Sequence, residues 1–99
     1  MKVNNLENAK KILRNEMDFL IQKYGVSEIG IFGSFVFSDF SEKSDIDILV
    51  SFKKPIGLFK FMELENYLAK KMGRKVDLVS KDGLKTYIKS DILNSAIYV

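Results

Sequence analysis

Three aspartates in two short apolar segments are the residues of this 99-residue chain best suited to chemistry. Asp45 and Asp47 alternate with β-branched residues in the segment 45–52, a pattern that predicts a strand. Alternation places both on one face, with Cα atoms roughly 6–7 Å apart by the strand rise. Two carboxylates this close repel unless a cation lies between them. The pair therefore indicates a divalent metal site, although the solvent face of an edge strand is the simpler explanation of such a pair standing alone.

A third carboxylate, Asp77, lies in the segment 75–79, which also predicts a strand. Aspartate is depleted in strands, so its presence in two of them needs a reason. If the two strands are neighbours in register, one face of the sheet gathers three carboxylates. That set could hold one or two Mg²⁺ ions, with water and phosphate oxygens as further ligands. Taken alone, Asp77 could equally be an exposed acid at a strand end.

Gly33 and Ser34 lie at the end of a short apolar segment, 28–33, that predicts a buried strand, and they precede a predicted single helical turn at 35–38. A glycine there allows a phosphate to approach the backbone, while a serine hydroxyl and the N–H groups at a helix start donate hydrogen bonds to anions. A plain turn is the alternative explanation of an isolated Gly-Ser pair.

The residue types that the chain lacks exclude several kinds of catalysis and metal binding. The chain has no Cys and no His, which excludes disulfides, thiolate or imidazole catalysis and metal sites built on those ligands. Any reaction must use carboxylates, hydroxyls, lysines and backbone amides. Carboxylates without imidazoles favour hard cations such as Mg²⁺.

Charge is divided unevenly along the chain. Residues 28–52 carry five acids and one lysine, while the whole protein has a net charge of +3. A basic protein with a local acidic cluster suits a polyanion that is held through metal ions, although a solvated acidic loop fits the charges equally well. The basic C-terminal half is not interleaved with an aromatic platform, so we do not expect a nucleic-acid partner.

Hydrophobic periodicity predicts the elements that must position these residues. Apolar residues recur every three or four positions at 6–24, at 58–72 and at Leu84, Ile88, Ile92 and Ala96, which predicts three amphipathic helices, the last running nearly to Val99. Asn4 with Glu7 resembles a capping box, and Gly25 and Gly73 mark helix ends. With three strands between them, these helices predict an α/β or α+β fold in which a small sheet is covered on at least one face.

Length and hydropathy limit the number of domains and indicate where the protein is located. We expect one domain, 1–99, because a chain this short cannot form two independent cores. No apolar run approaches the roughly 20 residues of a membrane helix, and the N-terminus has no signal-peptide pattern. We therefore expect a cytoplasmic protein without a membrane partner.

The joint spacing is more specific than any of its parts. Gly33-Ser34, nine residues, then Ser44-Asp45-Ile46-Asp47 and a later Asp77 between apolar residues resemble the signature of the DNA polymerase β-like nucleotidyltransferase superfamily. The length, the opening helix and the ending from Leu84 to Val99 are similar to its smallest members, the minimal nucleotidyltransferases (MNT type) of prokaryotic toxin–antitoxin pairs. The resemblance covers nearly the whole chain.

This resemblance implies a mixed sheet with flanking helices and the transfer of AMP from ATP, with Mg²⁺, to a hydroxyl. By position, Gly33, Ser34 and Ser44 would bind the nucleotide, and Asp45, Asp47 and Asp77 would be catalytic and ligate the metal. In MNT-type antitoxins the acceptor is a tyrosine of a partner HEPN-domain ribonuclease toxin. The resemblance therefore implies a protein adenylyltransferase that acts as an antitoxin.

One departure from the pattern leaves an alternative open. Many members place arginines after the Gly-Ser, where this chain has Phe35-Val36-Phe37. These apolar side chains could belong to the core or to a partner surface, and Lys43, Lys53 or Lys54 could supply the missing cation. A non-catalytic binding module that neutralises a partner toxin by occlusion is the alternative function.

Overall fold

The elements alternate between helix and strand along most of the chain. The computed structural model describes residues 3–36, 44–83 and 95–99. Within them the elements are α1 (Leu6–Tyr24), β1 (Val26–Phe32), the 3₁₀ turn η1 (Gly33–Phe35), β2 (Ile46–Phe52), α2 (Leu58–Met72), β3 (Val76–Ser80), the 3₁₀ turn η2 (Lys81–Gly83) and β4 (Ile97–Tyr98).

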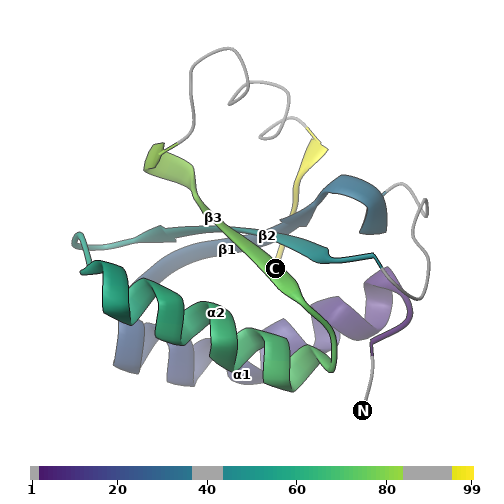
Figure 1. Ribbon diagram of the computed structural model, residues 1–99, viewed down its shortest axis with the longest axis horizontal. Coiled ribbons are helices and arrows are strands. Elements are labelled where there is room, and N and C mark those ends of the chain that lie inside the picture. Colours follow the sequence, from purple (N-terminus) through teal and green to yellow (C-terminus); the bar gives the residue numbers. More distant parts are fainter. Residues whose placement is uncertain (1–2, 37–43, 84–94) are drawn as a thin grey trace.

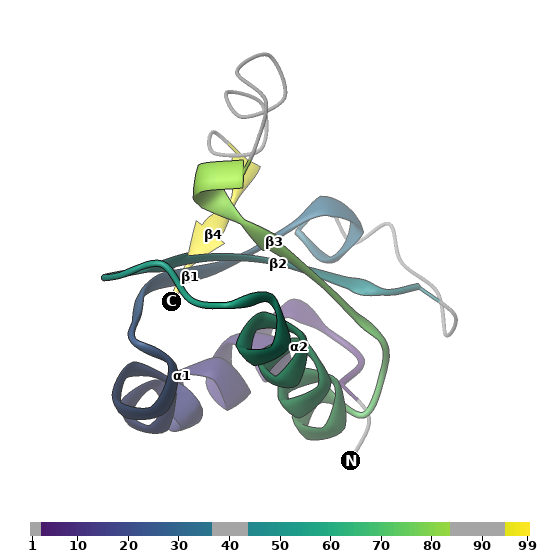
Figure 2. The same cartoon turned by 60° about the vertical axis from the view of Figure 1, so that its left-hand side comes forward.

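The four strands form one mixed sheet in the order β3-β2-β1-β4. β1 is antiparallel to β2 and to β4, whereas β2 and β3 are parallel. Both helices lie against the same face of this sheet, as Figures 1 and 2 show from two directions. The predicted α+β class, with a small mixed sheet and flanking helices, is confirmed.

The first helix forms where the periodicity predicts it, over Leu6–Tyr24, and turns its apolar stripe to the sheet. Leu13 and Leu20 on that stripe are fully buried. Its start differs from the prediction by one residue, because the N-cap is Asn5, whose side chain accepts a hydrogen bond from the backbone N–H of Asn8 at 2.8 Å. Asn4 instead contacts neighbouring asparagine side chains. Gly25 ends the helix at φ +69°, as expected.

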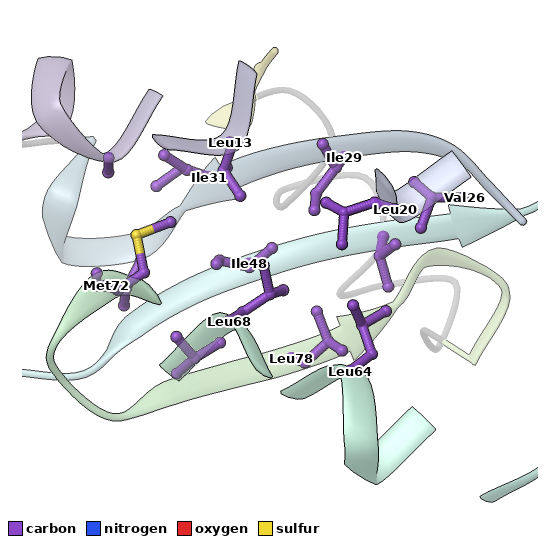
Figure 3. Close-up of a cluster of buried hydrophobic side chains, with 14 of the residues drawn as sticks. Leu13, Leu20, Val26, Ile29, Ile31, Ile48, Leu64, Leu68, Met72 and Leu78 are labelled. Carbon is purple, nitrogen blue, oxygen red and sulfur yellow. The ribbon is translucent and has the colours of Figure 1, made fainter. Parts of the chain in front are cut away.

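The core fills the space between the two helices and the sheet (Figure 3). α2 spans Leu58–Met72, as predicted, and buries Leu64, Leu68 and Met72. These side chains meet Ile48 and Leu78, which point toward the helices from β2 and β3. Because residues alternate along a strand, the neighbours of these buried aliphatics face away from the helices. The face toward the helices is thus packed. On the other face Leu49 of β2 is buried as well, whereas Asp47 is only partly buried and Asp77 is exposed, so the part of that face around the aspartates is available for chemistry.

The C-terminal end of the chain is a strand, where the sequence predicts a helix running nearly to Val99. Ile97 and Tyr98 form β4 and pair with Ile31 and Gly30 of β1, and the backbone N–H of Val99 donates to Ile29 at 3.0 Å. Pairing satisfies backbone groups of β1 that would otherwise form an open edge, and a β-branched and an aromatic residue suit a strand. The predicted helix positions Leu84, Ile88 and Ile92 lie outside the described residues.

At the other edge of the sheet, a side chain from α2 reaches the backbone of β3. The carboxylate of Glu65 accepts a hydrogen bond from the backbone N–H of Leu78 at 2.9 Å. The helix is thereby attached to the edge strand by a polar contact as well as by its buried leucines. In the part of the chain that the structure describes, no helix is long and apolar enough to cross a membrane.

Candidate active site

The parallel pairing of β2 with β3 brings two of the predicted carboxylates side by side. Asp47 and Asp77 are direct partners in the register of these strands, and neighbouring strands lie about 4.8 Å apart. Their sequence neighbours Ile46, Ile48 and Val76 are buried against the helices, so both aspartates lie on the face away from the helices. The sequence predicts carboxylates gathered on one face only if the two strands are neighbours in register, and the structure shows that they are.

Asp45 directly precedes β2, two residues before Asp47. Its carboxylate lies 3.9 Å from the ammonium of Lys75, and the exposed fraction is 40% for the Asp45 side chain and 80% for that of Lys75. An ion pair this long and this exposed contributes little stability. It therefore leaves the Asp45 side chain able to turn toward another cation.

In the group of three carboxylates, Asp47 is the one on which the other two act electrostatically. The pKa of Asp47 is raised above its ordinary value, chiefly because the carboxyl is partly withdrawn from water, and then because of the negative charges of Asp77 and Asp45. A carboxylate that is both desolvated and beside like charges gains more than an exposed one from an added cation. Asp47 is the centre of this group.

The Gly33-Ser34 turn lies directly beside Asp47. β1 ends at Phe32, the register partner of Asp47, and η1 begins at Gly33. Gly33 has φ +74°, and a Cβ placed on it would collide with the carboxylate oxygen Oδ2 of Asp47. Both the backbone conformation and the space therefore require glycine here. The turn holds peptide groups against the carboxylate cluster, as a phosphate site beside a metal site would need.

The residues after the turn belong to the core. Phe35 is 1% exposed, and Val36 packs against the buried cluster. For these two residues the core interpretation of the apolar run is confirmed, whereas Phe37 lies outside the described residues. Lys53 and Lys54 follow the C-terminal end of β2, at the opposite end of the strand from Asp45. They are too distant to replace an arginine beside the turn, and Lys43 lies outside the described residues.

An arginine that the sequence pattern did not single out contacts both halves of the site. Arg74 lies between α2 and β3 and is 9% exposed. Its Nη1 donates to the carbonyl of Ser44 at 2.9 Å, and its guanidinium lies 5.1 Å from the ring centre of Phe35. Ser44, predicted to bind nucleotide, is half-buried here, directly before Asp45. Only the three-dimensional contacts identify Arg74, since its position after a helix-ending glycine is ordinary for a basic residue.

The donor chemistry fits a hard divalent cation. Asp45, Asp47 and Asp77 offer carboxylate oxygens, the ligands that Mg²⁺ prefers, and the like-charge repulsion at Asp47 would be relieved by a cation. Among the described residues, no three acidic side chains are already gathered closely enough to hold an ion. The Asp45 side chain, which points to Lys75, has to turn for all three to share one.

Comparison with known proteins places this arrangement in a family. A nucleotidyltransferase domain family matches residues 10–99. The protein adenylyltransferase MntA of Thermococcus cleftensis is 45% identical over 94 residues, which cover 95% of each chain. A solved structure assigned to the minimal nucleotidyltransferases superposes with a TM-score of 0.81, at 29% identity and 95% coverage of both chains. A toxin–antitoxin structure with AMP-PNP gives a TM-score of 0.71 at 26% identity, over 93% of this chain and 70% of that one.

The matching domain family and the adenylyltransferase relatives, together with the α+β fold, define the chain as a nucleotidyltransferase enzyme. It belongs to the nucleotidyltransferase domain family. The resemblance based on Gly33-Ser34 and Asp45-Ile46-Asp47 is thereby confirmed, as is the expectation of an enzyme. The roles of the individual residues stay predictions.

Proposed function

We propose that this protein transfers AMP from ATP to a hydroxyl of a partner protein and thereby acts as the antitoxin of a toxin–antitoxin pair. The observation that carries the proposal is the pairing of Asp47 with Asp77 in register, with the backbone of Gly33 against the Asp47 carboxylate. A relative 45% identical over nearly its full length is named a protein adenylyltransferase. A similar solved structure is a toxin–antitoxin complex with the ATP analogue AMP-PNP.

In the proposed reaction, the oxygen of the acceptor hydroxyl forms a bond to the α-phosphorus of ATP. The bond from that phosphorus to the bridging oxygen of the β-phosphate breaks, pyrophosphate leaves, and the hydroxyl proton passes to water. The residues of this chain would mainly orient the two reactants and balance the charge of the phosphates. We infer that the acceptor is a tyrosine of a HEPN-domain toxin, as the resemblance implies, and that the reaction occurs in the cytoplasm.

Each predicted site residue has a part in this scheme. The Gly33-Ser34 turn would bind the distal phosphates and Ser44 would contribute to the nucleotide site, while Asp45 and Asp47 would ligate Mg²⁺. Asp77 would complete the ligands of the ion that polarises the acceptor hydroxyl. Magnesium, when bound, supplies charge neutralisation and lowers the pKa of that hydroxyl. The whole described chain would serve as a single nucleotidyltransferase domain.

The test is mass spectrometry of a candidate HEPN toxin after incubation with this protein, ATP and Mg²⁺. We expect the mass of at least one adenylyl group on a toxin tyrosine, and no addition when a chelator removes the metal. Asp77→Asn should lower the rate at least 100-fold, the scale for removing one preorganised electrostatic group, while leaving toxin binding unchanged. Asp18→Asn, the same change on the exposed side of α1, is the matched control and should transfer normally.

The same experiment decides between catalysis and occlusion. If the Asp77→Asn protein neutralised the toxin as well as the parent at catalytic as well as stoichiometric ratios, a binding module would replace the enzyme. Calorimetry adds an independent criterion, because ATP should bind with measurably higher affinity when Mg²⁺ is present. Equal affinity with and without the metal would contradict the role of Asp45 and Asp47.

A further inference from the structure

Arg74 lies where three separate segments of the chain meet. Its Nε donates to the carbonyl of Val3 at 2.9 Å, its Nη1 donates to the carbonyl of Ser44 at 2.9 Å, and its guanidinium faces the ring of Phe35. These partners come from the segment before α1, the segment before β2 and the η1 turn. A buried guanidinium with partners in three segments fixes their relative positions.

Two of these three segments carry the halves of the active-site motif. Phe35 is the last residue of η1, which begins at Gly33, and Ser44 directly precedes Asp45. Beside Arg74, the carbonyl of Lys75 accepts the backbone N–H of Ile46 at 3.0 Å, which joins the start of β2 to the segment leading into β3. Arg74 thus stands between the predicted phosphate turn and the first predicted metal ligand.

The contacts require the shape of an arginine. A guanidinium donates in several directions from one rigid plane, and the face of that plane stacks on an aromatic ring. A lysine keeps the charge, but its donors share one compact nitrogen without a flat face, so they do not reproduce the separate Nε and Nη1 contacts together with the stacking on the ring. The contacts of Arg74 are therefore not reproduced by a positive charge alone.

We propose that Arg74 is a positioning residue for nucleotidyl transfer, which sets the spacing between the Gly33-Ser34 turn and Asp45 by holding Phe35 and the Ser44 carbonyl together. This inference rests on the proposed function. In such a reaction, phosphates and metal must be aligned with the acceptor, and a displacement of about 1 Å can cost about 100-fold in rate. Arg74 acts through the backbone of the site and does not itself touch the phosphates in this scheme.

The test uses Arg74→Lys, which keeps the charge and loses the planar fork. We expect the transfer rate per folded molecule to fall about 10- to 100-fold, the range for lost outer support of a metal site. The Mg²⁺ concentration for half-maximal rate should rise, while the KM for the acceptor protein stays the same. Leu64→Ala is the matched control, because Leu64 is a buried side chain of α2 facing the core. It should lower Tm without changing the rate at temperatures where it is fully folded.

A second variant separates the ring contact from the hydrogen bonds. Phe35→Leu removes the ring under the guanidinium and keeps both carbonyl partners of Arg74. It should change rate and Mg²⁺ requirement in the same direction as Arg74→Lys but less, and the double variant should be less impaired than the two effects multiplied. Fully multiplicative effects would contradict a shared role.

Amide NMR spectra keep the proposal testable even if the parent protein transfers no nucleotide. Arg74→Lys should then shift the amide signals of Gly33–Phe35 and of Asp45–Asp47 together and weaken the response of those signals to added Mg²⁺. The amide of Gly25, at the far end of β1, should not move. A rate within twofold of the parent, or for an inactive parent an unchanged Mg²⁺ response, would overturn the positioning role of Arg74.

Discussion

The two faces of the sheet are built from the same strands and differ in character: one is apolar and buried against the helices, and the other carries the charged aspartates. On the face toward α1 and α2, Ile46, Ile48 and Val76 are almost completely buried. On the other face, the residues between them include Asp47 and its register partner Asp77, whose negative charge helps to raise the pKa of Asp47. The alternation of side chains along a strand allows one segment of seven residues, β2, to supply both faces.

Because of this difference, substitutions on one face should change stability and substitutions on the other should change activity. Removing apolar volume from the packed face should weaken folding and leave the chemistry of the remaining folded molecules intact. Changing the carboxylate face should remove activity and leave folding intact or improved. Three substitutions test this separation, and the expected change in stability decreases from Ile48→Ala through Gly33→Ala to Asp47→Asn.

Ile48→Ala should destabilise the protein by about 3–4 kcal/mol, since it leaves a cavity in a closely packed core. Ile48 is 0% exposed and contacts the helices from the centre of β2. Urea unfolding followed by circular dichroism measures the loss. The folded fraction should still transfer nucleotide at the parental rate. A strongly reduced rate per folded molecule would mean that the packed face also positions the site.

Gly33→Ala should cost about 2–3 kcal/mol in stability, of which about 1–2 kcal/mol comes from a left-handed backbone with a Cβ and about 1 kcal/mol from overpacking. The overpacking comes from the collision with the Asp47 carboxylate. By displacing that carboxylate, the variant should also lower the transfer rate about 100-fold.

Gly25→Ala is the matched control for this substitution. Gly25 has φ +69°, and beyond its own chain neighbours no residue has an atom within 4 Å of a Cβ placed there. It should lose only the backbone part of the stability and keep the full transfer rate. Equal losses of rate in the two variants would show that the turn at Gly33 has no special relation to Asp47.

Asp47→Asn should raise the free energy of unfolding at pH 7 by about 0.5–1 kcal/mol, the scale for like charges on paired strands. The pKa of Asp47 is raised in the folded protein from an ordinary 3.8. The folded state of the parent protein is therefore more stable, relative to the unfolded state, when Asp47 is protonated than when it is charged. That advantage is present below pH 3.8 and is lost as pH rises through the folded-state pKa.

The stability difference between Asp47→Asn and the parent should therefore be smallest in acid and should grow to a plateau toward neutral pH. Urea titrations of both proteins between pH 3 and pH 7 provide the measurement. Asp18→Asn should show no comparable growth. A destabilised Asp47→Asn protein at pH 7 would mean that the carboxylate supports the fold, and the proposed division between the two faces would fail.

Local patterns predicted much of this fold because local forces determine those elements. The repeat of Leu13, Leu20, Leu64 and Leu68 along two helices can be read without knowing what they face, and the alternation of Asp45, Ile46 and Asp47 indicates a strand by itself. The glycine ends of both helices are also local features. The N-cap lies one residue later than predicted, because Asn4 and Asn5 are both residues that can cap a helix and the sequence alone does not distinguish them.

Features decided by distant partners could not be predicted in this way. Ile97 and Tyr98 form a strand because β1 offers them an edge, and a two-residue strand leaves no periodic pattern. The role of Arg74 depends on Val3, Phe35 and Ser44, which are remote from it in sequence. The pairing of Asp47 with Asp77 was open for the same reason, since register depends on how two strands meet.

The hydrogen bond that the Glu65 carboxylate accepts from the backbone of β3 also affects the tendency of the protein to aggregate at high concentration. β3 is an outer strand of the sheet, and such strands invite other chains to add to them and grow into aggregates. At Leu78 the N–H already donates to Glu65, so an arriving strand would have to displace an anion to use it. One side chain of α2 therefore opposes the addition of a further strand at the middle of β3.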